Sequence, residues 1–171
     1  MIITAIDPGT MESGFVVCDG VNRPTTKTKI TNISILNGLR NNVFRPDVVV
    51  IEEINPYTIG KTTRDTILWS GRFQEAIESR GGKVVYLSRN QVRQALCGSA
   101  GSKINDTVIK QALVDRFAYG EKNFGKGTKK EPGFFYGFKA DMWQAFALAV
   151  AYADIHGLNF KNSGGALCCQ K

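Results

Sequence analysis

The sequence has little that would build a zinc or disulfide scaffold. Its 171 residues include one histidine and four cysteines, and no two cysteines form a Cys-x-x-Cys pair. A structural zinc site needs about four such ligands at short spacing. Cys18 lies in an apolar run that is typical of a small buried side chain, whereas Cys168 and Cys169 are adjacent in a polar tail. The fold must therefore depend on an ordinary hydrophobic core.

Long apolar segments are also absent. No run approaches the roughly 20 residues that a membrane-spanning helix needs. Residues 1–6 lead directly into a strand-like pattern, without the basic start and long apolar stretch of a secretory signal. With 43% hydrophobic residues, the composition is that of a globular domain. We expect a soluble, cytoplasmic protein with no membrane partner.

Basic residues are in excess. The 22 Lys and Arg against 15 Asp and Glu give a net charge of +7, and the isoelectric point is about 9.3. Such a charge favours a polyanionic partner, because basic side chains displace the counterions condensed on phosphates. Charge alone does not separate a nucleic-acid-binding protein from a basic protein with another role.

The first third of the chain predicts strands. Ile2–Ile6 and Gly14–Cys18 are β-rich runs joined by the turn formers of residues 7–10. Alternating Lys and Thr within residues 19–31 predict a short exposed strand, and a brief helix is expected before Pro46. Val48–Ile51 is a continuous apolar run, typical of a central strand buried on both faces.

Helices and strands alternate in the remainder. Residues 62–80 predict a helix that Gly81-Gly82 would stop, Val84–Leu87 predicts a strand, and Asn105 or Asp106 is suited to cap another helix. An Ala-, Leu- and Val-rich run over residues 142–156 predicts a helix packed tightly on the sheet. This alternation is typical of an α/β domain.

The domain is expected to span residues 1–158 as one unit, because the chain is too short for two full-sized cores. Within it, residues 120–140 combine five glycines, five lysines and an aromatic cluster, and we expect a mobile basic loop. Residues 159–171 are expected to form a flexible C-terminal tail.

Three acidic residues stand where a predicted element meets the surface. Asp7 ends the first strand, Glu52 follows the central strand, and Asp141 begins the last helix. If the two strands are neighbours and the helix crosses them, the three carboxylates converge. Clustered carboxylates repel one another, and hard cations such as Mg²⁺ or Mn²⁺ relieve that repulsion. A pair of such ions roughly 4 Å apart supports phosphodiester hydrolysis.

Each carboxylate also has an ordinary structural explanation. Asp7 is suited to start a Pro-Gly turn, Glu52 to a solvated loop, and Asp141 to a helix N-terminus, whatever the function. Only the joint pattern favours a metal site.

Four segments, in the same order along the chain, resemble the RuvC family of Holliday junction resolvases. They are Ala5–Thr10 with Gly14 and Phe15, Pro46–Glu53, Arg89–Gln94 through Lys103, and Asp141–Ala149. The resemblance implies a ribonuclease-H-like α/β fold, with a mixed five-stranded sheet flanked by helices. The small size suggests a phage or mobile-element member, which would act in the host cytoplasm.

What the resemblance implies about function is specific. The protein would be a homodimer that cuts four-way DNA junctions symmetrically, with two Mg²⁺ or Mn²⁺ ions in each active site, held by Asp7, Glu52 and Asp141. Arg93 and Lys103 become candidate phosphate contacts. An aromatic side chain that wedges into the junction is expected near the site, with Tyr57 and Phe135 as candidates, although a buried or simply exposed aromatic fits both equally well.

One residue departs from the family pattern. The final helix usually carries a second carboxylate three residues after the first, on the same helical face, and this chain has Gln144 there. An amide oxygen binds a hard cation more weakly than a carboxylate does. We therefore expect impaired cutting, and the near-isosteric relation of Gln to Glu raises the hypothesis of a Glu-to-Gln change that blocks activity.

Three other functions stay open. Asp-x-Gly-Thr after a first strand also occurs in actin-like ATPases, but those need two lobes around a nucleotide. Gln144 supports a junction-binding protein that has little or no catalytic activity. A ribonuclease that cuts RNA/DNA hybrids would share the metal site and differ in substrate.

Overall fold

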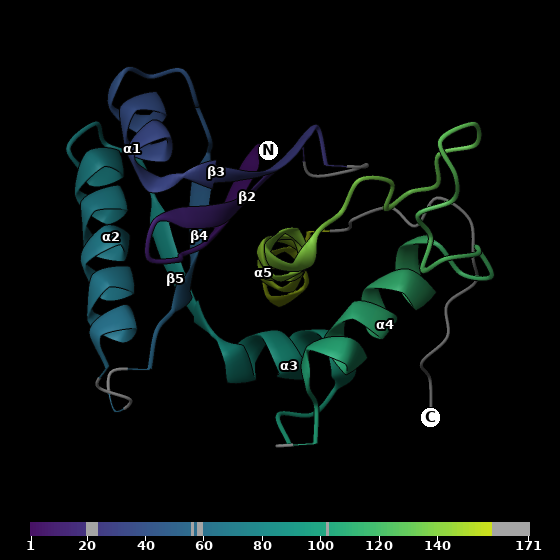
Figure 1. Ribbon diagram of the computed structural model, residues 1–171. Helices are drawn as coiled ribbons and strands as arrows, with labels where there is room; N and C mark the ends of the chain where they lie inside the picture. The colour runs from purple at the N-terminus through teal and green to yellow at the C-terminus, as the bar shows by residue number, and fades with distance from the viewer. Residues whose placement is uncertain (20–23, 56, 58–59, 102, 159–171) are drawn as a thin grey trace.

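The computed structural model describes residues 1–19, 24–55, 57, 60–101 and 103–158. These residues form a five-stranded sheet with helices on both faces (Figure 1). The strands are β1 (Ile3–Asp7), β2 (Glu12–Cys18), β3 (Thr26–Thr31), β4 (Val48–Glu53) and β5 (Val84–Ser88). The helices are α1 (Asn32–Arg40), α2 (Lys61–Glu78), α3 (Arg89–Cys97), α4 (Asp106–Phe117) and α5 (Ala140–Ile155).

The sheet is mixed. Its strand order is β3-β2-β1-β4-β5. Strands β1, β2 and β3 form an antiparallel meander, whereas β4 and β5 run parallel to β1. The mixed five-stranded sheet flanked by helices is therefore confirmed, including the exposed third strand expected within residues 19–31.

The central strand β4 is buried on both faces, as its apolar run predicted. Val49 and Ile51 pack in the cluster beneath α1 and α2, and Val48 and Val50 pack in the cluster beneath α5. Successive side chains of a strand point to opposite faces, so one apolar run supplies both cores.

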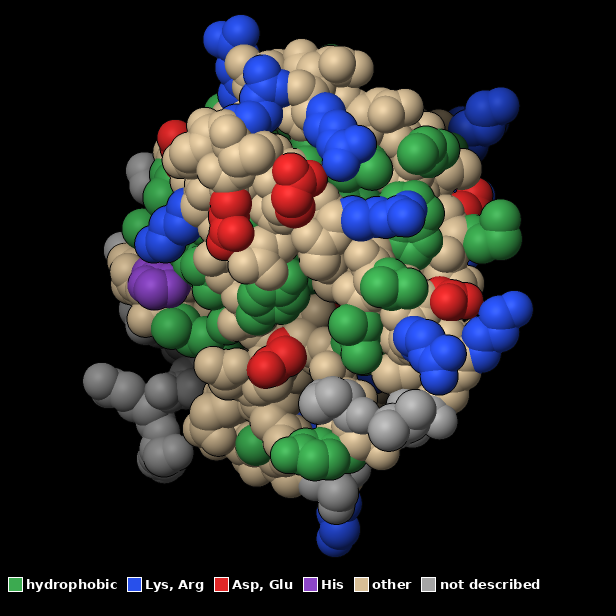
Figure 2. Space-filling view, turned by 90° about the vertical axis from the view of Figure 1, so that its left-hand side faces the viewer, with side chains coloured by type: hydrophobic (Ala, Val, Ile, Leu, Met, Phe, Trp, Pro, Cys, Tyr) green, Lys and Arg blue, Asp and Glu red, His purple; other side chains and the backbone are tan. Residues whose placement is uncertain are grey.

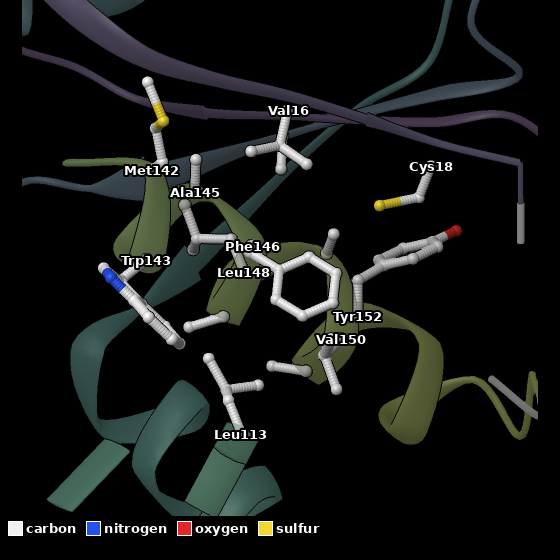
Figure 3. Packing of buried hydrophobic residues seen from close by; sticks show 14 of the residues in the cluster. Val16, Cys18, Leu113, Met142, Trp143, Ala145, Phe146, Leu148, Val150 and Tyr152 are labelled. Atoms are coloured by element: carbon white, nitrogen blue, oxygen red, sulfur yellow. The ribbon is translucent and has the colours of Figure 1, made fainter. Parts of the chain in front are cut away.

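Helix α5 is buried almost all around its surface. It lies between the sheet and α3 and α4, and Figure 3 shows Val16 and Cys18 on its sheet side with Leu113 of α4 on the other side. The alanines at every second position from Ala145 to Ala153 are fully buried. Small side chains let the helix lie close to the sheet, and this closeness brings the first turn of α5 to the ends of β1 and β4.

The segment of residues 120–140, whose last residue begins α5, contains an isolated bridge between Gly127 and Pro132 but no other helix and no named strand. Its aromatic half belongs to the core, since Phe135 is fully buried and its ring lies 4.3 Å from that of Trp143. Phe134 and Phe138 are buried as well. That the basic part is mobile stays a prediction, and the expected flexible tail lies outside the described residues.

Within the described ranges, no helix has both the length and the apolar character that crossing a bilayer requires.

Candidate functional site

Three predicted site residues share one cleft. Asp7 ends β1 and Glu52 lies near the end of β4, and because Ile6 pairs with Ile51 in these parallel strands, the two carboxylates are neighbours. Asp141 lies in the first turn of α5. All three line a cleft of about 550 Å³, and Gln144 lines it as well, one helical turn after Asp141.

The negative charges of these carboxylates repel one another. The pKa of Asp7 is raised to about 9, chiefly by burial and further by a hydrogen bond with Glu52 and by the charges of Glu52 and Asp141. Only the nearby Arg89 opposes the shift. Positive charge from Arg89 therefore does not offset the burial of Asp7 and the repulsion from its neighbouring carboxylates. A cation bound beside Asp7 would favour its ionised form.

The donor chemistry fits a hard divalent cation. The cleft offers carboxylate oxygens from Asp7, Glu52 and Asp141 and an amide oxygen from Gln144, and Mg²⁺ and Mn²⁺ prefer such ligands. Among the described residues, however, no three Asp, Glu, His or Cys side chains are already gathered as a metal-binding group. Asp141 instead forms an ion pair with Lys29 of β3, in which Oδ2 and Nζ are 2.6 Å apart.

A hydrogen-bonded ring holds the turn that follows Asp7. The hydroxyl of Ser13 donates to Asn32 Oδ1 at 2.6 Å, Asn32 Nδ2 donates to the carbonyl of Gly9 at 2.9 Å, and the Gly9 N–H donates to Ser13 Oγ at 3.2 Å. Ser13 and Asn32 are both buried, so the ring is shielded from water. It ties the β1–β2 turn to α1 and limits the movement of Asp7.

Gly14 permits the close approach of α5. It pairs with Asp7 across β1 and β2, and a Cβ atom built on it would lie 2.3 Å from the carbonyl oxygen of Asp141. Only a residue without a side chain fits beneath this helix end. We therefore expect Gly14→Ala to push the first turn of α5 off the sheet and to lower the free energy of unfolding by about 1–3 kcal/mol, as overpacking does.

Chemical denaturation followed by circular dichroism measures that loss. Alanine is otherwise more favourable than glycine in a strand interior. An unchanged or higher stability in Gly14→Ala would show that this contact does not hold the helix end.

Basic side chains line the same cleft. Arg89 follows β5 directly and forms an ion pair with Asp106 at the start of α4. Lys110, Lys126 and Lys139 complete the basic part of the lining. Burial lowers the pKa of Lys110, and Lys126 adds to the effect. A cleft that joins clustered carboxylates to guanidinium and ammonium groups is suited to a phosphodiester and the backbone around it.

The predicted DNA contacts lie outside this cleft lining. Arg93 is half-buried on α3, where its guanidinium donates to Asn90 Oδ1 at 3.4 Å. Lys103 is exposed between α3 and α4, and Tyr57, between β4 and α2, is 92% exposed. Phe135 is buried and is not accessible as a wedge, so its alternative assignment to the core is the correct one.

Sequence reasoning did not single out five basic residues near the carboxylates: Lys29, Arg89, Lys110, Lys126 and Lys139. Two of them belong to the lysine-rich segment of residues 120–140, and Arg89 opens one of the motifs noted above. The alternation of Lys and Thr in β3 predicted an exposed strand and gave no sign of a partner for Lys29. Their positions depend on strand register and on helix packing.

Comparisons with known proteins find the same fold in solved structures but no match by sequence. No protein-family model matches the sequence, and no curated protein is significantly similar to it. The structure of Thermus thermophilus RuvC matches with a TM-score of 0.65 at 20% identity, over 92% of this chain and 98% of that one. T. thermophilus RuvC in complex with a Holliday junction substrate matches with a TM-score of 0.64 at 18% identity, over 91% and 94%.

A eukaryotic structure matches as well. The yeast mitochondrial Holliday junction resolvase gives a TM-score of 0.60 at 12% identity, over 91% of this chain and 79% of that one. The chain thus has the ribonuclease-H-like fold of the RuvC resolvases along most of its length, as its motifs indicated.

Proposed function

We propose that the protein is a metal-dependent endonuclease that resolves four-way DNA junctions by hydrolysing one phosphodiester bond in each of two strands. The observation that carries this proposal is the single cleft in which Asp7, Glu52, Asp141 and Gln144 lie beside a basic lining. The shared fold supports it, since one structure of that fold is T. thermophilus RuvC with a Holliday junction substrate.

The proposed cofactors are two Mg²⁺ or Mn²⁺ ions in each active site. Asp7, Glu52 and Asp141 would hold the ions, with Gln144 as a weaker, uncharged ligand. When bound, such ions stabilise the charge that develops on the phosphate oxygens during hydrolysis. Asp7 ends β1 and Glu52 lies near the end of the adjacent parallel strand β4, so the sheet keeps their backbones at a constant separation.

The basic side chains would bind DNA by its backbone. Arg89 presents a planar guanidinium that pairs well with phosphate, and Lys110 and Lys126 supply further positive charge in the cleft. Arg93 and Lys103 are proposed to contact the arms of the junction beyond the cleft, and Tyr57 to wedge between bases near the branch point. A junction has no unusual base edges, so recognition would depend on phosphate positions and on the angle between arms.

A homodimer would place two such sites on one junction. Figure 2 views the side of the molecule covered by α2, where hydrophobic side chains reach the surface between charged ones. Ile67 is 41% and Leu68 60% exposed on this helix. Basic Arg64 precedes them and acidic Glu75 follows, which also pairs with Arg40 of the same chain, so an antiparallel second copy of α2 would meet opposite charges. We propose this face as the contact between protomers.

Leu68→Glu tests the dimer. The new carboxylate would be buried at the centre of the contact without a partner, which disfavours association. We expect the variant to elute as a monomer in size-exclusion chromatography with light scattering, and the unchanged protein to elute as a dimer. Tyr119→Glu is the control, because Tyr119 is 77% exposed after α4, on the other side of the sheet. Equal masses for all three proteins would place the contact elsewhere or exclude it.

The activity is tested by incubating the protein with a labelled four-way junction, a matched duplex and an RNA/DNA hybrid, each with Mg²⁺, Mn²⁺ or EDTA. Metal-dependent cutting confined to the junction is the expected result. Cutting of the hybrid alone would assign a ribonuclease, and tight junction binding without cutting, also in Gln144→Glu, would assign a binding protein. Both outcomes would overturn the proposal.

A further inference from the structure

Lys29 lies in a row of residues that crosses the sheet to the candidate metal site. Lys29 of β3 is paired with Gly14 of β2, and Gly14 is paired with Asp7 of β1. Residues directly opposite one another on neighbouring strands point to the same face. Because Gly14 has no side chain, the first turn of α5 lies directly over it, and Asp141 there stands between the lysine and Asp7.

Lys29 reaches the site from outside the large cleft. It lines a separate hollow of about 360 Å³ together with Asp7, Asp141 and the β1–β2 turn, and it does not line the cleft that contains Glu52 and Gln144. In this hollow its Nζ lies 2.6 Å from Asp141 Oδ2 and 3.9 Å from Glu12 Oε2. The ammonium group therefore has a near partner in the site and a second carboxylate within short reach.

We propose that Lys29 is a positioning residue, an internal counter-ion that holds Asp141 in the metal-free protein and turns to Glu12 when a divalent cation binds. The inference rests on the proposed function, because it assumes that Asp141 is a metal ligand.

The physical reason is competition for one negative charge. Without a cation, the carboxylates of Asp7, Glu52 and Asp141 repel one another, and Lys29 offsets part of that repulsion. A divalent cation beside Asp141 would in turn be repelled by the ammonium group. Glu12 can relieve this repulsion between the cation and Lys29, because it offers the ammonium group another partner, which lines the same hollow but lies outside the metal site.

Two substitutions are expected to change metal affinity in opposite directions. Lys29→Met removes the competing charge, and we expect the protein to bind Mn²⁺ about five- to tenfold more tightly at physiological salt. Glu12→Gln removes the alternative partner, and we expect Mn²⁺ to bind about two- to threefold more weakly. Mn²⁺ binding is measured by electron paramagnetic resonance of the free ion, without DNA.

Thermal unfolding gives a second readout. Lys29→Met should melt at a lower temperature than the unchanged protein in EDTA, and saturating Mn²⁺ should remove the difference, because metal binding stabilises the variant more. A lysine with a purely structural role would lower the melting temperature equally with and without Mn²⁺.

Lys27→Met is the matched control. It lies two residues away on β3, has the same charge change, and its ammonium group lies over the ring of Phe138. Mn²⁺ affinity in Lys27→Met should equal that of the unchanged protein. If the unchanged protein binds no Mn²⁺, the proposed function fails. If it binds Mn²⁺ and Lys29→Met binds equally or more weakly, this inference alone is overturned.

Discussion

Asp7→Asn is expected to lower the rate of metal-dependent junction cleavage by at least about a thousandfold, because it removes a charged ligand of the proposed metal ions. A thousandfold loss of rate corresponds to about 4 kcal/mol of transition-state stabilisation. Asp7 lies between the charges of Glu52 and Asp141, and it ends the strand that pairs with β4. Asparagine keeps the size of the side chain but removes the charge that a divalent cation requires. Single-turnover cleavage of a labelled junction measures the loss.

Junction binding should persist in Asp7→Asn, because the basic lining of the cleft is unchanged. Asp115→Asn is the control, since Asp115 is exposed on α4 and lies outside the cleft lining. Cleavage by Asp7→Asn within a few fold of the unchanged protein would remove Asp7 from the site.

The same variant should alter the pH dependence of stability. The folded state raises the pKa of Asp7 from 3.8 to about 9, so it holds the proton more tightly than the unfolded chain. The tighter binding of this proton stabilises the folded state, and that stabilisation is fully present below about pH 4 and is lost as the pH rises toward 9. Asparagine cannot ionise, so in EDTA we expect Asp7→Asn to lose less stability than the unchanged protein between pH 5 and pH 8.

Gln144→Glu is expected to increase the rate of cleavage at limiting Mg²⁺ by about tenfold, in line with the size of ligand effects on metal affinity. Gln144 lines the cleft one helical turn after Asp141, so a carboxylate there would face the same cation. The added charge strengthens cation binding and, without metal, adds to the repulsion among the carboxylates.

Measuring the rate against Mg²⁺ concentration separates affinity from maximal rate. Gln94→Glu, on α3 and outside the cleft lining, adds the same charge as a control. No gain in Gln144→Glu over this control would reject both the ligand role of residue 144 and the hypothesis that a Glu-to-Gln change blocks activity.

Much of the fold could be predicted because its core elements carry strong local patterns. The apolar run of β4 and the alanine-rich α5 are buried on nearly all sides, so their sequences read as continuous hydrophobic segments. Helix α3 is different, since it is short and Val92 is its only fully buried residue, while Ala95, Leu96 and Cys97 are partly buried against the core. The burial of Phe134 was not predicted, and that of Phe135 was only one of two open alternatives, because the glycines around them indicate a loop and show no period.

The site could be predicted only where its residues end a recognisable element. Asp7, Glu52 and Asp141 each stand at such an end, and the structure brings them to one cleft, while their role as metal ligands stays a prediction. Lys29 and Arg89 come into the site through the register of β3 with β2 and through the packing of α3 and α4. These relations join distant parts of the chain, and no local pattern encodes them.

Cutting of a supercoiled plasmid that extrudes a cruciform tests the central claim most directly. The products show whether two strands are cut within one encounter, because paired nicks across the junction linearise the plasmid and a single nick leaves a relaxed circle. We predict linear product that requires Mg²⁺ or Mn²⁺ and is absent with Asp7→Asn. Relaxed circles alone, nicks spread over ordinary duplex, or cutting that persists in EDTA would contradict the account.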